Sequence, residues 1–310
     1  MARPPRPGRP TPAARPKPAT PRTSRVKPKR PPLAQLADRN DLYQRAVQCV
    51  EAEIDFVDQT FKALRGRHAR VLREDFCGTA NTSCEWVRRR PTNIAIGLDL
   101  DHDALAWGIE HNLARLKPAQ RPRVELRRSN VLDPHPDLKG RMDTVLAMNF
   151  SFWTFARRAD MLAYFKRVRE DLCRDGVFFL DFYGGFDAFK QIRERRAIPH
   201  ARKAEPSVID FNHPFTYIWQ QESFDPISGK LVCKIHFEFP DGSKLKDAFT
   251  YEWRLWTLPE IRDVLADAGF SRSTVYWEGD DDDGEGNGVF TASEQGEACA
   301  SWVCFISAEK

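Results

Sequence analysis

The segment that decides the fold is residues 71–80, which read Val-Leu-Arg-Glu-Asp-Phe-Cys-Gly-Thr-Ala. An apolar start followed by acidic residues and a turn of small residues is typical of a strand that ends at a ligand and opens a helix, because small residues let backbone N–H groups approach the ligand closely. A second strand pattern, Ile-Gly-Leu-Asp-Leu-Asp, follows at residues 96–101. Asp99 ends this strand about 20 residues after Gly78, a spacing at which a carboxylate accepts the hydroxyls of a ribose.

Strand and helix patterns alternate on both sides of this segment. We expect strands at residues 70–73, 94–99, 123–128, 143–148 and 177–182, with amphipathic helices between them. An apolar helix face over residues 47–64 precedes the first strand, and a capping box at residues 257–260 begins a late helix. Strands joined through helices pair in parallel, so the pattern predicts a doubly wound α/β sheet.

The period changes to two in the last third of the chain. Apolar and polar residues alternate through residues 231–239 and 249–255, which predicts an antiparallel meander of about three strands over residues 211–255. Two final strands at residues 272–277 and 302–307 flank an acidic loop, which we interpret as solvated rather than as a calcium site. We therefore expect one domain over residues 33–310, in which the antiparallel β insert acts as a substrate lid.

The first 32 residues differ in composition from the rest. They hold ten Lys or Arg, no Asp or Glu, and eleven of the 22 prolines, so the formal charge of +4 combines a basic tail with an acidic body. Such a segment cannot bury apolar surface, and we expect residues 1–32 to be disordered. We interpret the tail as a solubility segment, and the alternative is weak electrostatic contact with nucleic acid.

Several classes of protein are excluded by composition. The sequence has no run long and apolar enough for a membrane span and no signal-peptide core, so we expect a cytoplasmic protein without membrane contact. The seven cysteines form no Cys-x-x-Cys pair, which fits a reducing compartment and predicts no metal site. The sequence leaves the oligomeric state open.

At residues 71–80 and 96–101 the sequence resembles the class I S-adenosylmethionine-dependent methyltransferase family. The family's first motif is an acidic residue followed by a glycine-rich turn, and Glu74 with the Cys-Gly-Thr-Ala of residues 77–80 is similar to it. The likeness continues at Asp99, at residues 129–133 and 148–151, and in the final hairpin. The resemblance implies a Rossmann-like sheet of seven strands and S-adenosyl-L-methionine as cofactor.

The resemblance also implies where the cofactor binds. The implied residues are Glu74, Asp75, Phe76, Cys77, Gly78, Thr79, Ala80, Asp99, Leu100, Asn130, Val131, Asn149, Phe150 and Ser151. Either Glu74 or Asp75 would hold the methionine amine. Phe76 stands where the family usually has glycine, so we expect the loop to take another path there. Ala80 replaces a second glycine, at little cost if its φ is negative.

The implied reaction is direct displacement of the sulfonium methyl by a nucleophile, which depends on positioning more than on side-chain chemistry. Where the acceptor needs a base, the candidates are Asp181, Tyr183, His213 and Tyr217, and we favour Asp181 and Tyr183 as catalytic residues. Asp181 ends the fifth strand, and open parallel sheets bind ligands at that edge.

The sequence thus predicts a methyltransferase that acts on a small-molecule acceptor. Trp153, Tyr217 and Trp219 are expected to bind the acceptor, since aromatic walls attract a sulfonium or a cationic amine. One alternative is an RNA or protein methyltransferase that docks through the basic tail. The other is a non-catalytic module that binds the cofactor for regulation. An NAD-dependent oxidoreductase fits less well, because the third glycine of its motif is missing.

Overall fold

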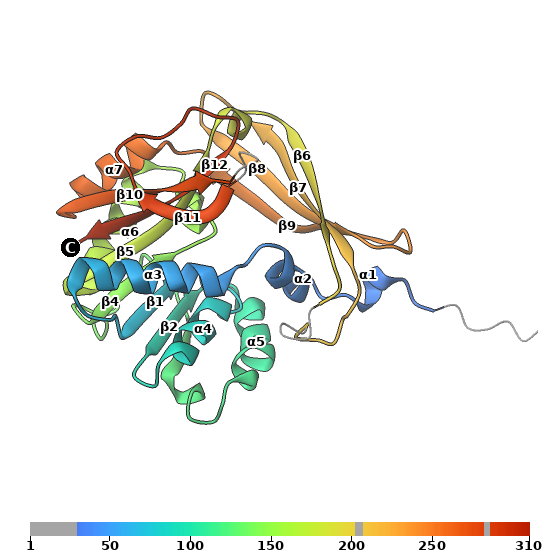
Figure 1. Ribbon diagram of the computed structural model, residues 1–310, viewed down its shortest axis with the longest axis horizontal. Coiled ribbons are helices and arrows are strands. Elements are labelled where there is room, and N and C mark those ends of the chain that lie inside the picture. The colour runs from blue at the N-terminus through green and yellow to red at the C-terminus, as the bar shows by residue number, and fades with distance from the viewer. Residues whose placement is uncertain (1–29, 202–206, 282–285) are drawn as a thin grey trace, which may run out of the picture. The chain divides into compact units, whose positions relative to one another are not determined.

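The computed structural model describes residues 30–201, 207–281 and 286–310 (Figure 1). The predicted disordered tail, with its possible nucleic-acid contact, falls almost entirely on residues 1–29, which lie outside the described residues. Residues 282–285 of the acidic loop lie outside them as well. Residues 32–310 form one unit. Within the described ranges, no helix has the length and apolar character that a bilayer crossing requires.

A mixed sheet of eight strands lies at the centre, in the order β11-β10-β12-β5-β4-β1-β2-β3. Its strands are β1 (Val71–Asp75), β2 (Ile94–Asp99), β3 (Val124–Arg128), β4 (Met142–Ala147), β5 (Leu172–Gly184), β10 (Arg272–Asp280), β11 (Gly286–Ala292) and β12 (Trp302–Glu309). Strands β1 to β5 pair in parallel, and β12, β10 and β11 extend the sheet in antiparallel. The doubly wound α/β fold is confirmed. The eighth strand is β11, whose mostly exposed residues carry no apolar alternation, so the sequence does not predict it.

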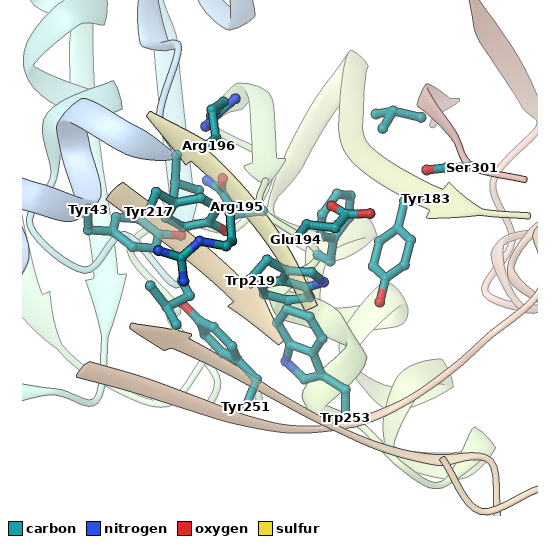
Figure 2. A pocket seen from close by; sticks show the side chains of 15 residues that line it. Tyr43, Tyr183, Glu194, Arg195, Arg196, Tyr217, Trp219, Tyr251, Trp253 and Ser301 are labelled. Carbon is teal, nitrogen blue, oxygen red and sulfur yellow. The ribbon is translucent and has the colours of Figure 1, made fainter. Parts of the chain in front are cut away.

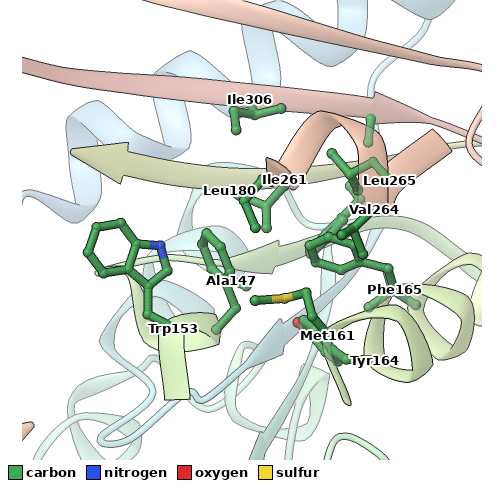
Figure 3. Packing of buried hydrophobic residues seen from close by; sticks show 14 of the residues in the cluster. Ala147, Trp153, Met161, Tyr164, Phe165, Leu180, Ile261, Val264, Leu265 and Ile306 are labelled. Carbon is green, nitrogen blue, oxygen red and sulfur yellow. The ribbon is translucent and has the colours of Figure 1, made fainter. Parts of the chain in front are cut away.

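Helices cover both faces of this sheet (Figure 1). They are α1 (Leu33–Leu36), α2 (Arg39–Ala46), α3 (Val50–Arg65), α4 (Asn81–Arg89), α5 (His102–His111), α6 (Arg158–Asp171) and α7 (Leu258–Asp267), with short 3-10 turns η1 (Leu113–Arg115), η2 (Arg121–Arg123), η3 (Ser151–Thr154) and η4 (Phe186–Phe189). The apolar face of α3 packs with α4 in one buried cluster. Helices α6 and α7 pack in another, around Phe165, Leu180 and Ile306 (Figure 3). The expected capping box of α7 is present between Thr257 and Glu260.

A second sheet of four antiparallel strands, which we call the accessory sheet, follows β5 in the chain. Its strands are β6 (Ile192–Ile198), β7 (Phe215–Phe224), β8 (Lys230–Glu238) and β9 (Lys244–Arg254), in sequence order. The meander predicted over residues 211–255 is present, but it has four strands and begins at residue 192. Strand β6 was missed because it reads Ile-Arg-Glu-Arg-Arg-Ala-Ile, a mainly charged and exposed segment without alternation.

Candidate functional site

The loop after β1 has an unusual backbone. Phe76, Gly78 and Ala80 have φ of 56°, 51° and 57°, in the left-handed region. The condition under which Ala80 would replace glycine at little cost is therefore not met, because a left-handed residue with a Cβ costs about 1–2 kcal/mol. The loop closes through a hydrogen bond from Ala80 N to Cys77 O, 2.7 Å long. Strain held in a short loop at the end of a strand is a feature of ligand-binding sites.

The Phe76 side chain leaves the front of this loop open. Its ring packs against Phe155 and Tyr164, with centroids 6.0 and 5.7 Å away. In front of Gly78, no atom of the described residues beyond its two chain neighbours lies within 4 Å of the place where a Cβ would stand. Phe76 has a left-handed φ, which glycine adopts more easily, and the space before Gly78 leaves room for a ligand to approach its backbone.

The loop presents its backbone rather than its side chains. Cys77 is 3% exposed and Thr79 is buried as well. Thr79 Oγ1 accepts a hydrogen bond from Gln44, and its carbonyl accepts one from Asn112, each 2.8 Å long. Gly108 lets α5 approach, since a Cβ there would lie 2.4 Å from Thr79 O. Contacts from α2 and α5 therefore fix the loop before any ligand binds.

The structure separates the two acidic candidates of β1. Asp75 is buried between Arg73 and Tyr164, and its Oδ2 accepts from both at 2.9 and 2.8 Å. The Glu74 side chain lies on the opposite face of the strand, and its Oε2 accepts hydrogen bonds from Ser83 N, at 2.8 Å, and from Ser83 Oγ. Because the Asp75 carboxylate is committed to an internal ion pair, the geometry favours Glu74 for a ligand amine.

Asp99 at the end of β2 is tied to the same loop. Its Oδ2 accepts the N–H of Gly78 at 2.6 Å, and its Oδ1 accepts the N–H of Asp101 at 2.8 Å. The next residue, Leu100, is 61% exposed, which is unusual for a leucine beside a buried strand. A fixed carboxylate suits a polar ring substituent of a ligand, and the exposed apolar side chain beside it suits a flat base.

The loops after β3 and β4 complete this edge of the sheet. Asn130 Oδ1 accepts the N–H of Leu132 at 3.0 Å, which leaves the side-chain NH₂ available, and Val131 between them is buried. Asn149 and Phe150 both have φ of 56°. The carboxyl ends of β1 to β4 thus present their loops at one edge, as in other open parallel sheets that bind ligands. We call this the cofactor edge.

Asp181 holds the loop after β4. Its two carboxylate oxygens accept the N–H groups of Asn149 and Phe150, at 2.7 and 2.9 Å. Ser151 adds a hydrogen bond from its Oγ to Met148 O. Burial raises the pKa of Asp181 to about 7. Asp181 therefore positions this loop, while its role as a base stays a prediction.

The second catalytic candidate, Tyr183, donates its hydroxyl to Gln221 Oε1 at 3.3 Å. Burial raises the pKa of Tyr183 well above its ordinary value. The phenol therefore stays protonated near neutral pH, and it is suited to donate a hydrogen bond rather than to accept a proton. His213 is exposed and is not among the residues of the cavity described next.

An aromatic cavity of about 670 Å³ opens beside the cofactor edge (Figure 2). Asn149 and Phe150 line it from the β4 loop, and Tyr183 lines it from β5. Tyr217 and Trp219 line it from the accessory sheet, where the sequence predicted them. The cavity is therefore walled by the cofactor edge on one side and by the accessory sheet on another.

Trp153, the third residue expected to bind the acceptor, does not line this cavity. It is fully buried, and its ring packs against Tyr183 and Trp253 at centroid distances of 4.7 and 5.9 Å. Because both of those residues line the cavity, Trp153 supports the wall from behind. The sequence showed an aromatic cluster at this place without showing which of its members is covered by the others.

Further lining residues were missed. Among them are Tyr43 of α2, Glu194, Arg195 and Arg196 of β6, and Tyr251 and Trp253 of β9. Tyr251 and Trp253 stack with centroids 4.5 Å apart, and alternation in β9 had already placed them on one face. Tyr43 and Glu194 gave no signal, because one lies in a short helix and the other in a charged strand.

Three carboxyl groups near the centre of the site have raised pKa values. Burial raises the pKa of Glu74 to about 7 and that of Glu53, on α3, to about 8. The negative charges of Asp181 and Glu74 add to the effect at Glu53, whose Oε2 is buried without a hydrogen-bond partner in the described part of the chain. Among the described residues, no Lys or Arg forms an ion pair with Glu53, Glu74 or Asp181. A cation at this place would offset their repulsion.

The solved structures with a similar fold include methyltransferases. A S-adenosylmethionine-dependent methyltransferase from Clostridium acetobutylicum ATCC 824 has a TM-score of 0.59 at 15% identity, covering 86% of this chain and 96% of its own. CalS10, an amino pentose methyltransferase from Micromonospora echinaspora, has 0.60 at 16%, covering 87% and 96%. The sugar N-methyltransferase KedS8 from Streptoalloteichus sp ATCC 53650 has 0.56 at 15%, covering 86% and 92%. No family model and no curated protein matches the sequence. The fold is that of class I S-adenosylmethionine-dependent methyltransferases, as the motifs implied.

Proposed function

We propose that the protein is a methyltransferase that moves the methyl group of S-adenosylmethionine to a small molecule held in the aromatic cavity. One observation carries this proposal: Asn149 and Phe150 belong both to the cofactor edge and to the lining of the cavity. A methyl donor on the edge and an acceptor in the cavity would therefore meet at the β4 loop. Direct displacement needs this in-line proximity above all.

The residues of the edge fit the parts of the cofactor. Asp99 would accept the ribose hydroxyls on its remaining lone pairs, Leu100 would pack against the adenine ring, and Asn130 would donate its NH₂ to the adenine edge. The open space before Gly78 admits the methionine segment. When bound, the cofactor supplies a sulfonium methyl group and one net positive charge.

The carboxyl groups of Glu53 and Glu74 support the same assignment. Glu74 is buried, and Glu53 is half-buried with its Oε2 covered. Neither has a basic partner among the described residues, and desolvation is the main cause of their raised pKa values. A ligand with an ammonium and a sulfonium group supplies the charge that this place lacks. A neutral ligand at the same place would leave the repulsion unrelieved.

The cavity supports a small acceptor rather than a macromolecular one. Its volume of about 670 Å³ is within the usual range for small-molecule sites. The neighbours CalS10 and KedS8 are by name an amino pentose methyltransferase and a sugar N-methyltransferase, which is consistent with this class of acceptor. Tyr183 and Asp181 then serve as hydrogen-bond donor and loop support, and the acceptor reacts through its position. The Phe76 ring packs against Phe155 and Tyr164, so this bulky residue in the cofactor loop gives no support to a non-catalytic module.

The test is cofactor affinity in an Asp99→Ala variant, measured by isothermal titration with S-adenosylmethionine. Hydrogen bonds to a charged group contribute about 1.5–3 kcal/mol, so the dissociation constant should rise about 10- to 100-fold. Asp103→Ala is the matched control, because it removes an exposed carboxylate from the following helix. Equal affinity of the wild type and Asp99→Ala for S-adenosylmethionine, with both proteins folded, would contradict the assignment of the cofactor edge as its binding site.

A further inference from the structure

The accessory sheet has a second cavity on its other face. Its volume is about 350 Å³, and side chains of all four strands line it, among them Arg193, Gln220, His236 and Lys246. We call it the outer-face cavity. Ile235 lines the aromatic cavity, and its neighbour His236 points to the opposite side, as alternation along a strand requires. A ligand here is separate from the proposed methyl acceptor.

His236 is the buried polar group of this cavity, with 7% of its surface exposed. Its Nδ1 lies 2.9 Å from the backbone N–H of Asp247 and accepts that proton. The network therefore assigns the neutral ring with its own proton on Nε2. Nε2 is buried and has no hydrogen-bond partner in the described ranges. A buried donor left unpaired costs about 1–3 kcal/mol, so its position next to a cavity indicates a missing acceptor.

The backbone opposite His236 is bent to make this arrangement. Ile235 pairs with Phe249 and Phe237 pairs with Leu245, so three residues of β9 stand opposite the single residue His236. Asp247 in this bulge has φ of 48°, which is unfavourable for a residue with a Cβ. The bulge takes the Asp247 N–H out of the strand ladder and directs it to the ring. Bulges of this kind are frequent beside functional sites.

The charges around His236 leave a positive surplus. Lys234 pairs with Glu222 at 2.7 Å and lies 3.8 Å from Asp247, the third carboxylate that lines the cavity. Lys244 pairs with Glu238 at 2.8 Å, and Arg195 reaches the same carboxylate. Arg193 and Lys246, which also line the cavity, have no carboxylate partner among the described residues. The unpaired charge of the outer-face cavity is thus cationic, next to a buried N–H donor.

We propose that the outer-face cavity binds a small oxyanion, a phosphate or carboxylate group, with His236 Nε2–H as its buried donor and Arg193 and Lys246 as its counter-charges. Burial is the main cause that lowers the pKa of His236. Arg193 and Lys234 lower it further, and Asp247 and Glu222 act against them. The ring therefore stays neutral at physiological pH, and the Nε2 proton remains directed at the ligand without a protonation step.

The experiment titrates inorganic phosphate into the full-length protein, with sodium chloride of equal ionic strength as reference. His236→Asn keeps a side-chain acceptor for the Asp247 N–H and removes the donor at the Nε2 position, so it should weaken phosphate binding at least tenfold. Arg193→Gln should weaken it several-fold. Lys230→Gln, which removes an exposed lysine paired with Glu252 on the same sheet, should bind as wild type does.

Acetate, titrated in parallel, identifies the source of the oxyanion. Tighter phosphate binding assigns a phosphate group, and tighter acetate binding assigns a carboxylate. A second measurement uses only the wild-type protein, so it does not depend on whether the variants fold. The NMR resonance of His236 Nε2–H should shift when the anion is titrated. The proposal is overturned where neither anion binds more tightly than chloride, or where His236→Asn binds them as wild type does. Neither result bears on the methyltransferase proposal.

Discussion

Replacing Glu53 with Gln should make the cofactor-free protein more stable in neutral and mildly alkaline solution. The Glu53 carboxyl is held by α3 in a buried place near Asp181 and Glu74, with one oxygen unpartnered among the described residues. Gln has the same shape and cannot ionise. The substitution therefore isolates the cost of a buried negative charge from the cost of lost packing.

The magnitude follows from the pKa of Glu53, which rises from 4.5 to about 8. In the unfolded chain the carboxyl ionises above about pH 4.5, while in the folded protein it keeps its proton until about pH 8. Stability is thus lost as the pH rises between these two values, at about 1.4 kcal/mol per pH unit. At pH 7 the loss amounts to about 3 kcal/mol, and it is absent at pH 4.5.

Urea unfolding at pH 5 and pH 7.5 measures this difference. The gain from Glu53→Gln should be less than about 1 kcal/mol at pH 5 and about 4 kcal/mol at pH 7.5, which is large against the total stability of a typical domain. Glu51→Gln, on the same helix but exposed, should show no such dependence on pH. A Glu53→Gln variant whose stability relative to wild type is the same at both pH values, or lower at pH 7.5, would refute the reasoning.

Three further predictions concern the site and the tail. Once an acceptor has been identified by screening for release of S-adenosylhomocysteine, Tyr217→Ala and Trp219→Ala should reduce methyl transfer to it and leave cofactor affinity unchanged by titration. A loss of cofactor binding together with a lower melting temperature would instead show a structural role. Cofactor affinity should rise as the pH increases from 5.5 to about 7.5, because the ionised form of Glu74, with a pKa of about 7, attracts the cation; a flat profile by calorimetry would contradict this. Deleting residues 1–32 should leave melting temperature and cofactor affinity unchanged and should abolish any salt-dependent RNA binding, which filter binding measures; a lower melting temperature would show that the tail packs on the domain.

The sequence predicted the parts of the fold whose local pattern and tertiary environment agree. Strands β1, β2 and β4 and the second half of β5 are largely buried, and they alternate along the chain with helical patterns, so their parallel pairing followed from this alternation. Strands β6 and β11 have exposed, polar residues, and their pairing depends on neighbours that are distant in sequence. Local pattern carries no record of such pairing.

The site shows the same division between local and non-local information. The spacing from Gly78 to Asp99 is a property of one strand, one loop and one helix, and the structure joins the two residues by a hydrogen bond. The choice between Glu74 and Asp75 depended on Tyr164, which is 89 residues away from Asp75 in sequence. Tyr43 meets the accessory sheet only through the packing of α2 against β8 and β9. No spacing rule connects these segments.

The central claim is that the edge formed by β1 to β4 binds S-adenosylmethionine. Isothermal titration of the purified full-length protein with S-adenosylmethionine, S-adenosylhomocysteine and NAD tests it most directly. The account predicts saturable binding of the first two at one site per chain, with no heat of binding from NAD. Binding of NAD, or the absence of binding by both adenosyl compounds to a folded protein, would contradict it.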